Sequence, residues 1–465
     1  MDGISKTQLL LREYALVLVF LVFVALSLCR SALAEEAAPP TRPLGRDLTP
    51  YTAPTEPGSS LPKVPEPTGE IGLRDALAAA LQGNPELASL SWEIRSREAQ
   101  TLQANIRPNP ELSVEVENFA GSGEQHGFDA SEITISLAQL VELGGKRVKR
   151  TRVAELEMVL ASWDYETKRV AVLTDTAKAF LLVLALQERA NLVRELEAIS
   201  SESVRSVAST VKAGAVSPIE EDRARVTLER VQLEAVRASK ELEAARALLS
   251  ATWGADTASF SRVQGDLHRS PEPPELERIL AVSVESPEIA RWNTEVAERE
   301  ARLSLERAHR IPDIAVSIGG RYYAQGDDLG LVASFSVPLP LFDRNRGNIL
   351  AARYQSSRAG AERRSAEVTV RSQITSAYRA LEAAFIEVVA LRDQIIPRAA
   401  RVFDETRRGY ATGLFRYVEV LDAQRTLFEA KRELLDVLTA YHIVATDIER
   451  LIATPLDQLQ NTQRP

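Results

Sequence analysis

Hydrophobic and polar positions follow two different periods along this chain. From about residue 146 to 212, apolar residues recur every three or four positions without an interrupting proline or glycine. At 1.5 Å per residue, such a helix is roughly 100 Å long. The same period predicts helices over about 72–106, from the turn at 212–219 to about 253, and over 275–309, 346–410 and 416–452. We expect Pro397 to kink the helix over 346–410.

Four short segments alternate with period two instead, which is typical of strands with one apolar face. They cover about 111–119, 130–141, 312–323 and 329–340. Each is about 9–12 residues long, enough for a tilted strand to cross a bilayer. The alternation alone equally fits two hairpins that pack their apolar faces against the helices of a soluble α+β protein. In the first segment, three apolar residues alternate with three polar ones, namely Leu112, Val114 and Val116 with Ser113, Glu115 and Glu117.

The two patterns occur twice in the same order, which indicates an internal duplication. "NPELASL" from residue 84 matches "SPEIARW" from 286, and "RPNPELSV" from 107 matches "HRIPDIAV" from 309. We therefore predict two repeats, 69–270 and 271–455, each built as helix, strand, strand, long helix and helix, with a tail at 456–465. The fold class is mainly α with β strands that suit a membrane.

The N-terminus reads as an export signal over residues 1–34. Two basic residues precede an apolar run from Tyr14 to Leu28, and "ALA" then places the cleavage site after Ala34. The alternative is an uncleaved membrane anchor. A lipid anchor on Cys29, the only cysteine, is not expected because Leu28 is a poor residue before the cut. Residues 35–68 are rich in proline and predict an extended leader.

Composition excludes several classes of function. The chain has 465 residues, of which 45% are hydrophobic and 26% charged, and its formal net charge is −9. A nucleic-acid partner is therefore not expected. The four histidines have no metal-ligand spacing and no cysteine partner, so we expect no dedicated metal site and no cofactor. No nucleophile–base pair or dinucleotide fingerprint points to an enzyme.

If the four strands lie in a membrane, one chain cannot complete the structure. A closed barrel needs about eight or more strands, and an open edge in lipid leaves backbone groups without partners. Several subunits must then share one barrel, and three subunits supply twelve strands. In the second helix of each hairpin, from the turn at 212–219 to about 253 and over 416–452, apolar residues recur at spacings of three and four. This spacing is typical of helices that pack together in such an assembly.

Three segments of the sequence resemble TolC-type outer membrane efflux proteins, and within them the CzcC-like branch linked to heavy-metal export. They are "RIPDIAVSIGGRYY", "FSVPLPLFDRNRGNI" and "RRGYATGLFRYVEVLDAQRTL". The resemblance covers about residues 70–455. It implies a homotrimer in the outer membrane of a Gram-negative bacterium, with a twelve-stranded β-barrel continued by a periplasmic α-helical barrel. It also implies three partners: a periplasmic membrane-fusion adaptor, an inner-membrane RND-type pump and outer-membrane lipid.

The resemblance further assigns two kinds of functional position. The corners where barrel strands become helices involve Gly144 and Gly145 in the first repeat and Pro338, Pro340, Asp343, Arg344 and Gly347 in the second. The periplasmic entrance lies at the helix-hairpin tips, where Glu419 and Asp422 match an acidic pair that rings the entrance, and Tyr410 matches a gate tyrosine. Phe415 stands where the best-known members carry an arginine, so a salt-bridge latch does not transfer.

The residues of the tips themselves also predict turns and a difference in charge between the two repeats. Gly214 and Gly413 allow the hairpins to turn. Glu220 aligns with Glu419, whereas Arg223 aligns with Asp422, so the two repeats differ in charge at the tips.

We therefore predict the passive outer-membrane channel of a tripartite pump, with cobalt-, zinc- or cadmium-type cations as cargo. The alternatives are a drug or type I secretion channel of the same fold, and a soluble periplasmic coiled-coil adaptor.

Overall fold

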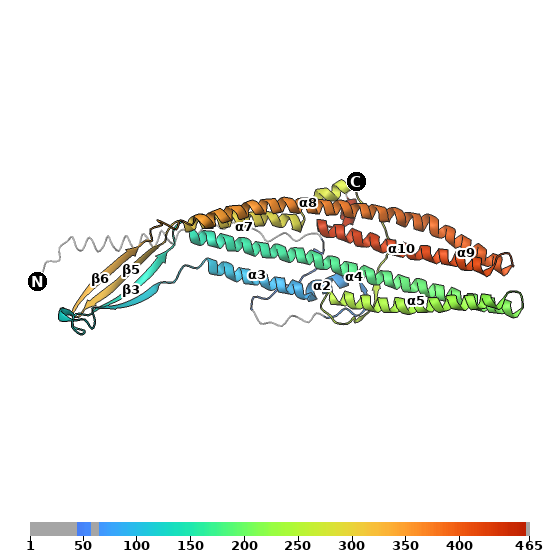
Figure 1. Cartoon of the computed structure of the whole chain (residues 1–465), viewed down its shortest axis with the longest axis horizontal. Helices are drawn as coiled ribbons and strands as arrows, with labels where there is room; N and C mark the ends of the chain where they lie inside the picture. The colour runs from blue at the N-terminus through green and yellow to red at the C-terminus, as the bar shows by residue number, and fades with distance from the viewer. Residues whose placement is uncertain (1–43, 57–64, 462–465) are drawn as a thin grey trace. The chain divides into compact units, whose positions relative to one another are not determined.

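The computed structural model describes residues 44–56 and 65–461, all within the unit that spans residues 41–465 (Figure 1). The predicted signal peptide, its cleavage site, Cys29 and part of the proline-rich leader therefore lie outside the described residues. Within this unit, long helices run side by side and a four-stranded sheet lies at one end of them (Figure 1).

The long helix of the first repeat, α4, spans Lys146–Lys212, as the periodicity predicts. The chain turns at the tip and returns as α5 (Pro218–Ala251). In the second repeat, α8 (Arg346–Ala390) and α9 (Ile396–Ala411) form the outgoing arm, and α10 (Tyr417–Ile452) returns. A π-helical segment, Leu391–Ile395, separates α8 from α9. It directly precedes Pro397, which lacks an N–H and cannot continue a regular α-helix.

Two predicted helices are each divided in the structure. The helix predicted over 72–106 is α2 (Leu73–Gly83) followed by α3 (Pro85–Ala104). Asn84 lies between them and its side chain accepts the N–H groups of Glu86 and Leu87, which starts the second helix. The helix predicted over 275–309 is α6 (Leu276–Ser283) and α7 (Pro287–His309). In both cases a proline at the first helical position begins the new helix.

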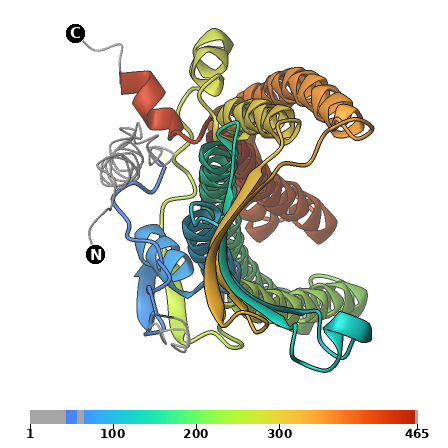
Figure 2. The ribbon, with the colours of Figure 1, turned by 90° about the vertical axis from the view of Figure 1, so that its left-hand side faces the viewer.

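The four predicted strands form one antiparallel sheet in the order β2-β3-β5-β6. Their bounds are Glu111–Glu117 (β2), Glu132–Val141 (β3), Ile314–Tyr323 (β5) and Asp328–Ser336 (β6). The last strand ends earlier than the predicted residue 340, because Pro338 and Pro340 cannot donate to a ladder. β3 and β5 pair across the two repeats, so the duplicated halves share a single curved sheet (Figure 2).

A smaller layer at the middle of the long helices has no counterpart in the sequence prediction. β1 (Gly69–Gly72) pairs in parallel with β4 (Phe260–Gln264), and α11 (Leu456–Asn461) occupies the predicted tail. Buried Phe180, Leu249 and Trp253 pack with the β1–β4 pair, whereas Leu456 of α11 packs in a separate cluster with the end of α10. Part of α4 is apolar enough to cross a membrane, but half of that window is buried, so its apolar residues belong to this core.

Residues 44–56 of the leader are packed against the helices by polar contacts. The N–H of Tyr51 donates to Leu81 O at 3.0 Å, and the N–H of Ala53 donates to Ser91 Oγ at 2.6 Å. Arg169 donates to Leu44 O at 2.9 Å while it pairs with buried Glu166 at 2.8 Å. This part of the leader is therefore fixed to α2, α3 and α4 through its backbone groups.

Candidate functional site

The two faces of the sheet differ sharply in chemistry. Cross-strand pairing puts Leu112 beside Leu137, Leu137 beside Ile318, and Gly320 beside Leu331, all on one face. These apolar side chains are exposed, and Leu331 is 90% exposed. An apolar face of this extent, left exposed by the described residues, indicates a surface made for lipid or a partner rather than for water.

The opposite face of the sheet carries carboxylates. Register places Glu117 directly across from Glu132, an unfavourable pair of like charges. Arg321, from the neighbouring strand, bridges them with ion pairs of 2.9 Å to Glu117 and 2.7 Å to Glu132, and also donates to Thr134 Oγ1 at 2.8 Å. Glu111, Glu115 and, on β6, Asp328 share this face, so five carboxylates stand against one arginine. The sequence pattern predicted the alternation of polar and apolar residues. It did not predict the pairing register of the strands, which brings Arg321 between Glu117 and Glu132.

The two corners between strand and helix are built differently. Gly144 and Gly145 both adopt left-handed backbone conformations, and a Cβ on Gly144 would lie 2.8 Å from Ile311. This is a conformation and a close approach that only glycine tolerates well. Lys146, the first residue of α4, pairs with Asp313 at 2.7 Å, and Asp313 also accepts the N–H of Leu143.

At the second corner, the left-handed residue is Asn345 and not a glycine. The carboxylate of Asp343 accepts the N–H of Asn345 at 2.9 Å, and the Asn345 amide donates to Glu306. Gly347 lies inside the first turn of α8. Arg344 Nε donates to Pro340 O at 3.2 Å. Asparagine tolerates the left-handed region better than most residues, so it replaces glycine at this turn.

Both hairpin tips end their first helix in the same hydrogen-bonded motif. Gly214 (φ +73°) donates to Val211 O, and Gly413 (φ +77°) donates to Tyr410 O. In each tip the following residue donates five positions back, which completes a Schellman motif. Phe415 packs over Gly409, where a Cβ would lie 2.3 Å from its ring. Phe415 therefore closes the tip by an apolar contact.

Tyr410 lies inside the packing between the two tips. Its ring is 5.6 Å from that of Tyr417, which is buried with Val207 of α4 and Phe403 of α9. Burial raises the pKa of Tyr410 above its usual value and that of Tyr417 to about 12, so both phenols are neutral at physiological pH. Tyr410 thus helps to hold the two hairpins of one chain together.

The predicted acidic residues at the tips have three different environments. Glu419 is exposed, and its carboxylate accepts the N–H of Arg416 at 2.7 Å, which closes a capping box at the start of α10. Asp422 is exposed and forms no ion pair with any residue in the described part of the chain. Both line a groove of about 420 Å³ between α9 and α10. Glu220 instead pairs with Arg223 at 3.1 Å.

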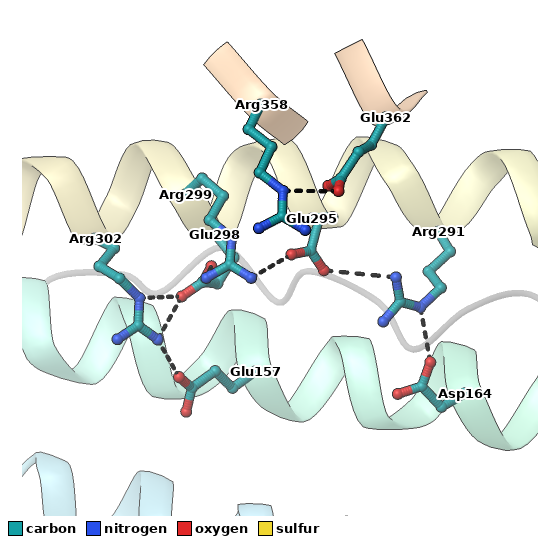
Figure 3. A network of polar contacts seen from close by, with 9 residues as sticks. All are labelled: Glu157, Asp164, Arg291, Glu295, Glu298, Arg299, Arg302, Arg358 and Glu362. Carbon is teal, nitrogen blue, oxygen red and sulfur yellow. Dashed lines mark hydrogen bonds and ion pairs between the residues drawn. The ribbon is translucent and has the colours of Figure 1, made fainter. Parts of the chain in front are cut away.

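A polar network joins the two repeats near the sheet (Figure 3). Arg302 of α7 pairs with Glu298 at 2.7 Å and also with Glu157 of α4. Glu298 is 1% exposed. Arg291 extends the network to Asp164 at 2.7 Å. Because the buried charges are paired, the network can fix α7 against α4 at one register. Among the described residues, no group of three or more His, Cys, Asp or Glu could hold a metal ion.

Comparisons with known proteins agree with this arrangement. The sequence profile described as "Outer membrane efflux protein" matches residues 76–255 and 281–454. The chain is 32% identical over 398 residues to the cobalt-zinc-cadmium resistance protein CzcC of Cupriavidus metallidurans. This alignment covers 85% of this chain and 93% of CzcC. It is 26% identical over 286 residues to the nickel-cobalt-cadmium resistance protein NccC of Alcaligenes xylosoxydans xylosoxydans, covering 62% of this chain and 64% of NccC. The crystal structure of the outer membrane protein VceC from Vibrio cholerae superposes with a TM-score of 0.67 at 16% identity, covering 83% of this chain and 96% of VceC.

Proposed function

The chain belongs to the outer membrane efflux protein family, and from this premise we propose that it is the passive exit channel of a tripartite pump that exports heavy-metal cations. In this proposal three chains form a twelve-stranded barrel in the outer membrane and a helical barrel in the periplasm. A periplasmic adaptor and an inner-membrane RND-type pump deliver the cargo. A signal peptide cleaved after Ala34 directs export, without a lipid on Cys29.

The exposed apolar face of an open sheet is the observation that carries the proposal. β2 and β6 each have one unpaired edge in the described chain. Such edges are not tolerated in lipid, so they require strands from sister chains. The helix layer also has an exposed apolar surface. α5 packs chiefly on α4 and leaves Ile219, Val226 and Leu233 exposed at seven-residue spacing. Such a spacing suits packing against another helix.

Two features favour cations as cargo. The polar face of the sheet, which would line the barrel, carries Glu111, Glu115, Glu117 and Glu132 against Arg321. At the other end, Glu419 and Asp422 would be repeated three times around the entrance. Carboxylates gathered around one opening attract cations and repel anions by superposition of their fields. The metal class is carried over from relatives that confer cobalt, zinc, cadmium or nickel resistance by name.

Neutralising the entrance carboxylates should lower the cation preference of the channel. Glu419→Gln with Asp422→Asn removes both charges, and glutamine still supports a capping box. The measurement is the reversal potential of the purified protein in a planar bilayer under a salt gradient. Glu429→Gln, on an exposed carboxylate of the same helix that pairs with Arg425, is the control. An unchanged reversal potential in the double variant would contradict a role for these residues at the entrance.

Metal cargo is tested separately by deletion of the gene. The proposal predicts increased sensitivity to zinc, cobalt or cadmium salts, restored by the wild-type gene. Increased sensitivity to organic drugs alone would instead support the drug channel.

A further inference from the structure

Five arginines line one groove at the second corner between strand and helix. The groove, of about 590 Å³, lies between the C-terminal end of α7 and the N-terminal end of α8. All five side chains are exposed, and the remaining lining comes from Ile349 and Leu350. The arginines are Arg307, Arg310, Arg344, Arg346 and Arg353.

No carboxylate neutralises these arginines. None of the five forms an ion pair with the residues described at 44–56 and 65–461, and the first turn of α8 contains no acidic residue. Of the nearby carboxylates, Asp313 is paired with Lys146, whereas Glu306 and Asp343 hydrogen-bond to the neutral Asn345 and keep their charges. Five arginines against these two carboxylates leave the groove with an excess of positive charge, which attracts an anion.

Exposed apolar side chains lie next to the arginines in sequence. Leu339, Leu341 and Phe342 follow β6 directly, and Phe342 is 98% exposed. They continue from a strand whose Leu331 and Phe335 lie on the exposed apolar face. Apolar side chains followed by basic ones at the end of a membrane strand are the combination expected where acyl chains meet phosphate groups. Exposure of Leu339, Leu341 and Phe342 to a water-filled passage would be unfavourable, because apolar side chains gain free energy when they leave water.

We propose that this arginine groove binds the phosphate of an anionic phospholipid in the periplasmic leaflet of the outer membrane, with the acyl chains beside Leu339, Leu341 and Phe342. Guanidinium groups bind phosphate oxygens in pairs, which suits this ligand better than a single ammonium would. The site rests on the proposed function, because that function puts the corner at the membrane surface. At the first corner, by contrast, Lys146 is buried and paired with Asp313, and Arg150 is paired with Glu142.

The test is lipid binding by the purified, delipidated full-length protein, followed by native mass spectrometry. Titration with dioctanoyl phosphatidylglycerol should give binding at least about tenfold tighter than titration with the zwitterionic phosphatidylcholine. Arg344→Gln with Arg346→Gln should weaken phosphatidylglycerol binding by roughly tenfold or more. Arg358→Gln should leave it unchanged, because Arg358 is an exposed arginine of α8 already paired with Glu362 at 2.8 Å.

Three results would overturn the lipid site: equal binding of the two lipids, unchanged binding by the double variant, or competition by inorganic phosphate at the same concentration as the lipid. The last would show a site for free phosphate. If the double variant fails to assemble, Arg307→Gln with Arg310→Gln probes the groove from α7 with the same expectation. Recovery of the protein outside the outer membrane would contradict the proposed function. The titration in detergent measures lipid binding by the groove whether or not the protein is recovered in that membrane.

Discussion

At the scale of single residues, the tips show how an apolar contact can take the place of an electrostatic one. The resemblance placed Phe415 where relatives carry an arginine and left its role open. In the structure its ring lies against Gly409, a position where any Cβ would collide with it. Glycine and phenylalanine therefore fit together as a pair. The sequence contains both residues, but only the helix end brings them into contact.

A pH effect is predicted at Glu449, where α10 meets α11. Burial raises the pKa of this carboxyl from about 4.5 to about 7, although it accepts the N–H of Leu456 at 2.8 Å. The folded chain holds this proton more tightly than the unfolded chain does. The stability that Glu449 contributes is therefore fully present below about pH 4.5 and is lost as the pH rises through about 7.

Glu449→Gln keeps an acceptor for Leu456 without the charge. It should raise the thermal unfolding midpoint clearly at pH 8 and only slightly at pH 5. Glu433→Gln, on an exposed residue of the same helix, should produce no difference between the two pH values. Equal effects of Glu449→Gln at pH 5 and pH 8 would show that Glu449 is not buried as described.

At the scale of elements, periodicity predicted what repeats along the chain and missed what depends on distant contacts. The seam residues of the return helices are buried, among them Val231, Ala238, Leu435 and Leu438. The breaks at Asn84 and Ser286 were missed because a short polar gap hardly disturbs a helical period. The β1–β4 pair was missed because Ile71 and Val263 meet only through the folding of the whole repeat. The acidic tip residues are proposed through the resemblance, since spacing alone does not distinguish them from solvated charges.

The sheet face offers a matched pair of substitutions on a single strand. Leu331→Arg puts a charge on the exposed apolar face, and a charge facing lipid near the bilayer centre costs about 2–4 kcal/mol. Ser334→Arg puts the same charge on the opposite face of β6, which carries the carboxylates, and should cost much less. The measurement is the amount of heat-sensitive oligomer in the outer membrane fraction. Equal losses for both variants would contradict a lipid-facing surface on this sheet.

At the scale of the whole molecule, one chain leaves several surfaces without partners. The sheet has unpaired edges at β2 and β6, and the helix layer has exposed apolar residues on α5. The proposed trimer accounts for all of these features together, because in it identical chains complete one another around a shared axis. The network around Glu298 and the packing of Tyr410 with Tyr417 then hold the two repeats of each chain as one section of the wall.

The most direct measurement of this central claim is a cross-link between the two edges of the sheet. Cys29, the only cysteine, leaves with the proposed signal peptide, so Ser113→Cys on β2 can be combined in turn with Ser334→Cys or Ser336→Cys on β6. A disulfide requires Cα atoms within about 7 Å, and β3 and β5 separate these strands within one chain. Oxidation of outer membranes should therefore give covalent trimers in at least one combination, and none from either single-cysteine control. Only monomers under all combinations, from a protein that also behaves as a monomer in solution, would contradict the shared barrel.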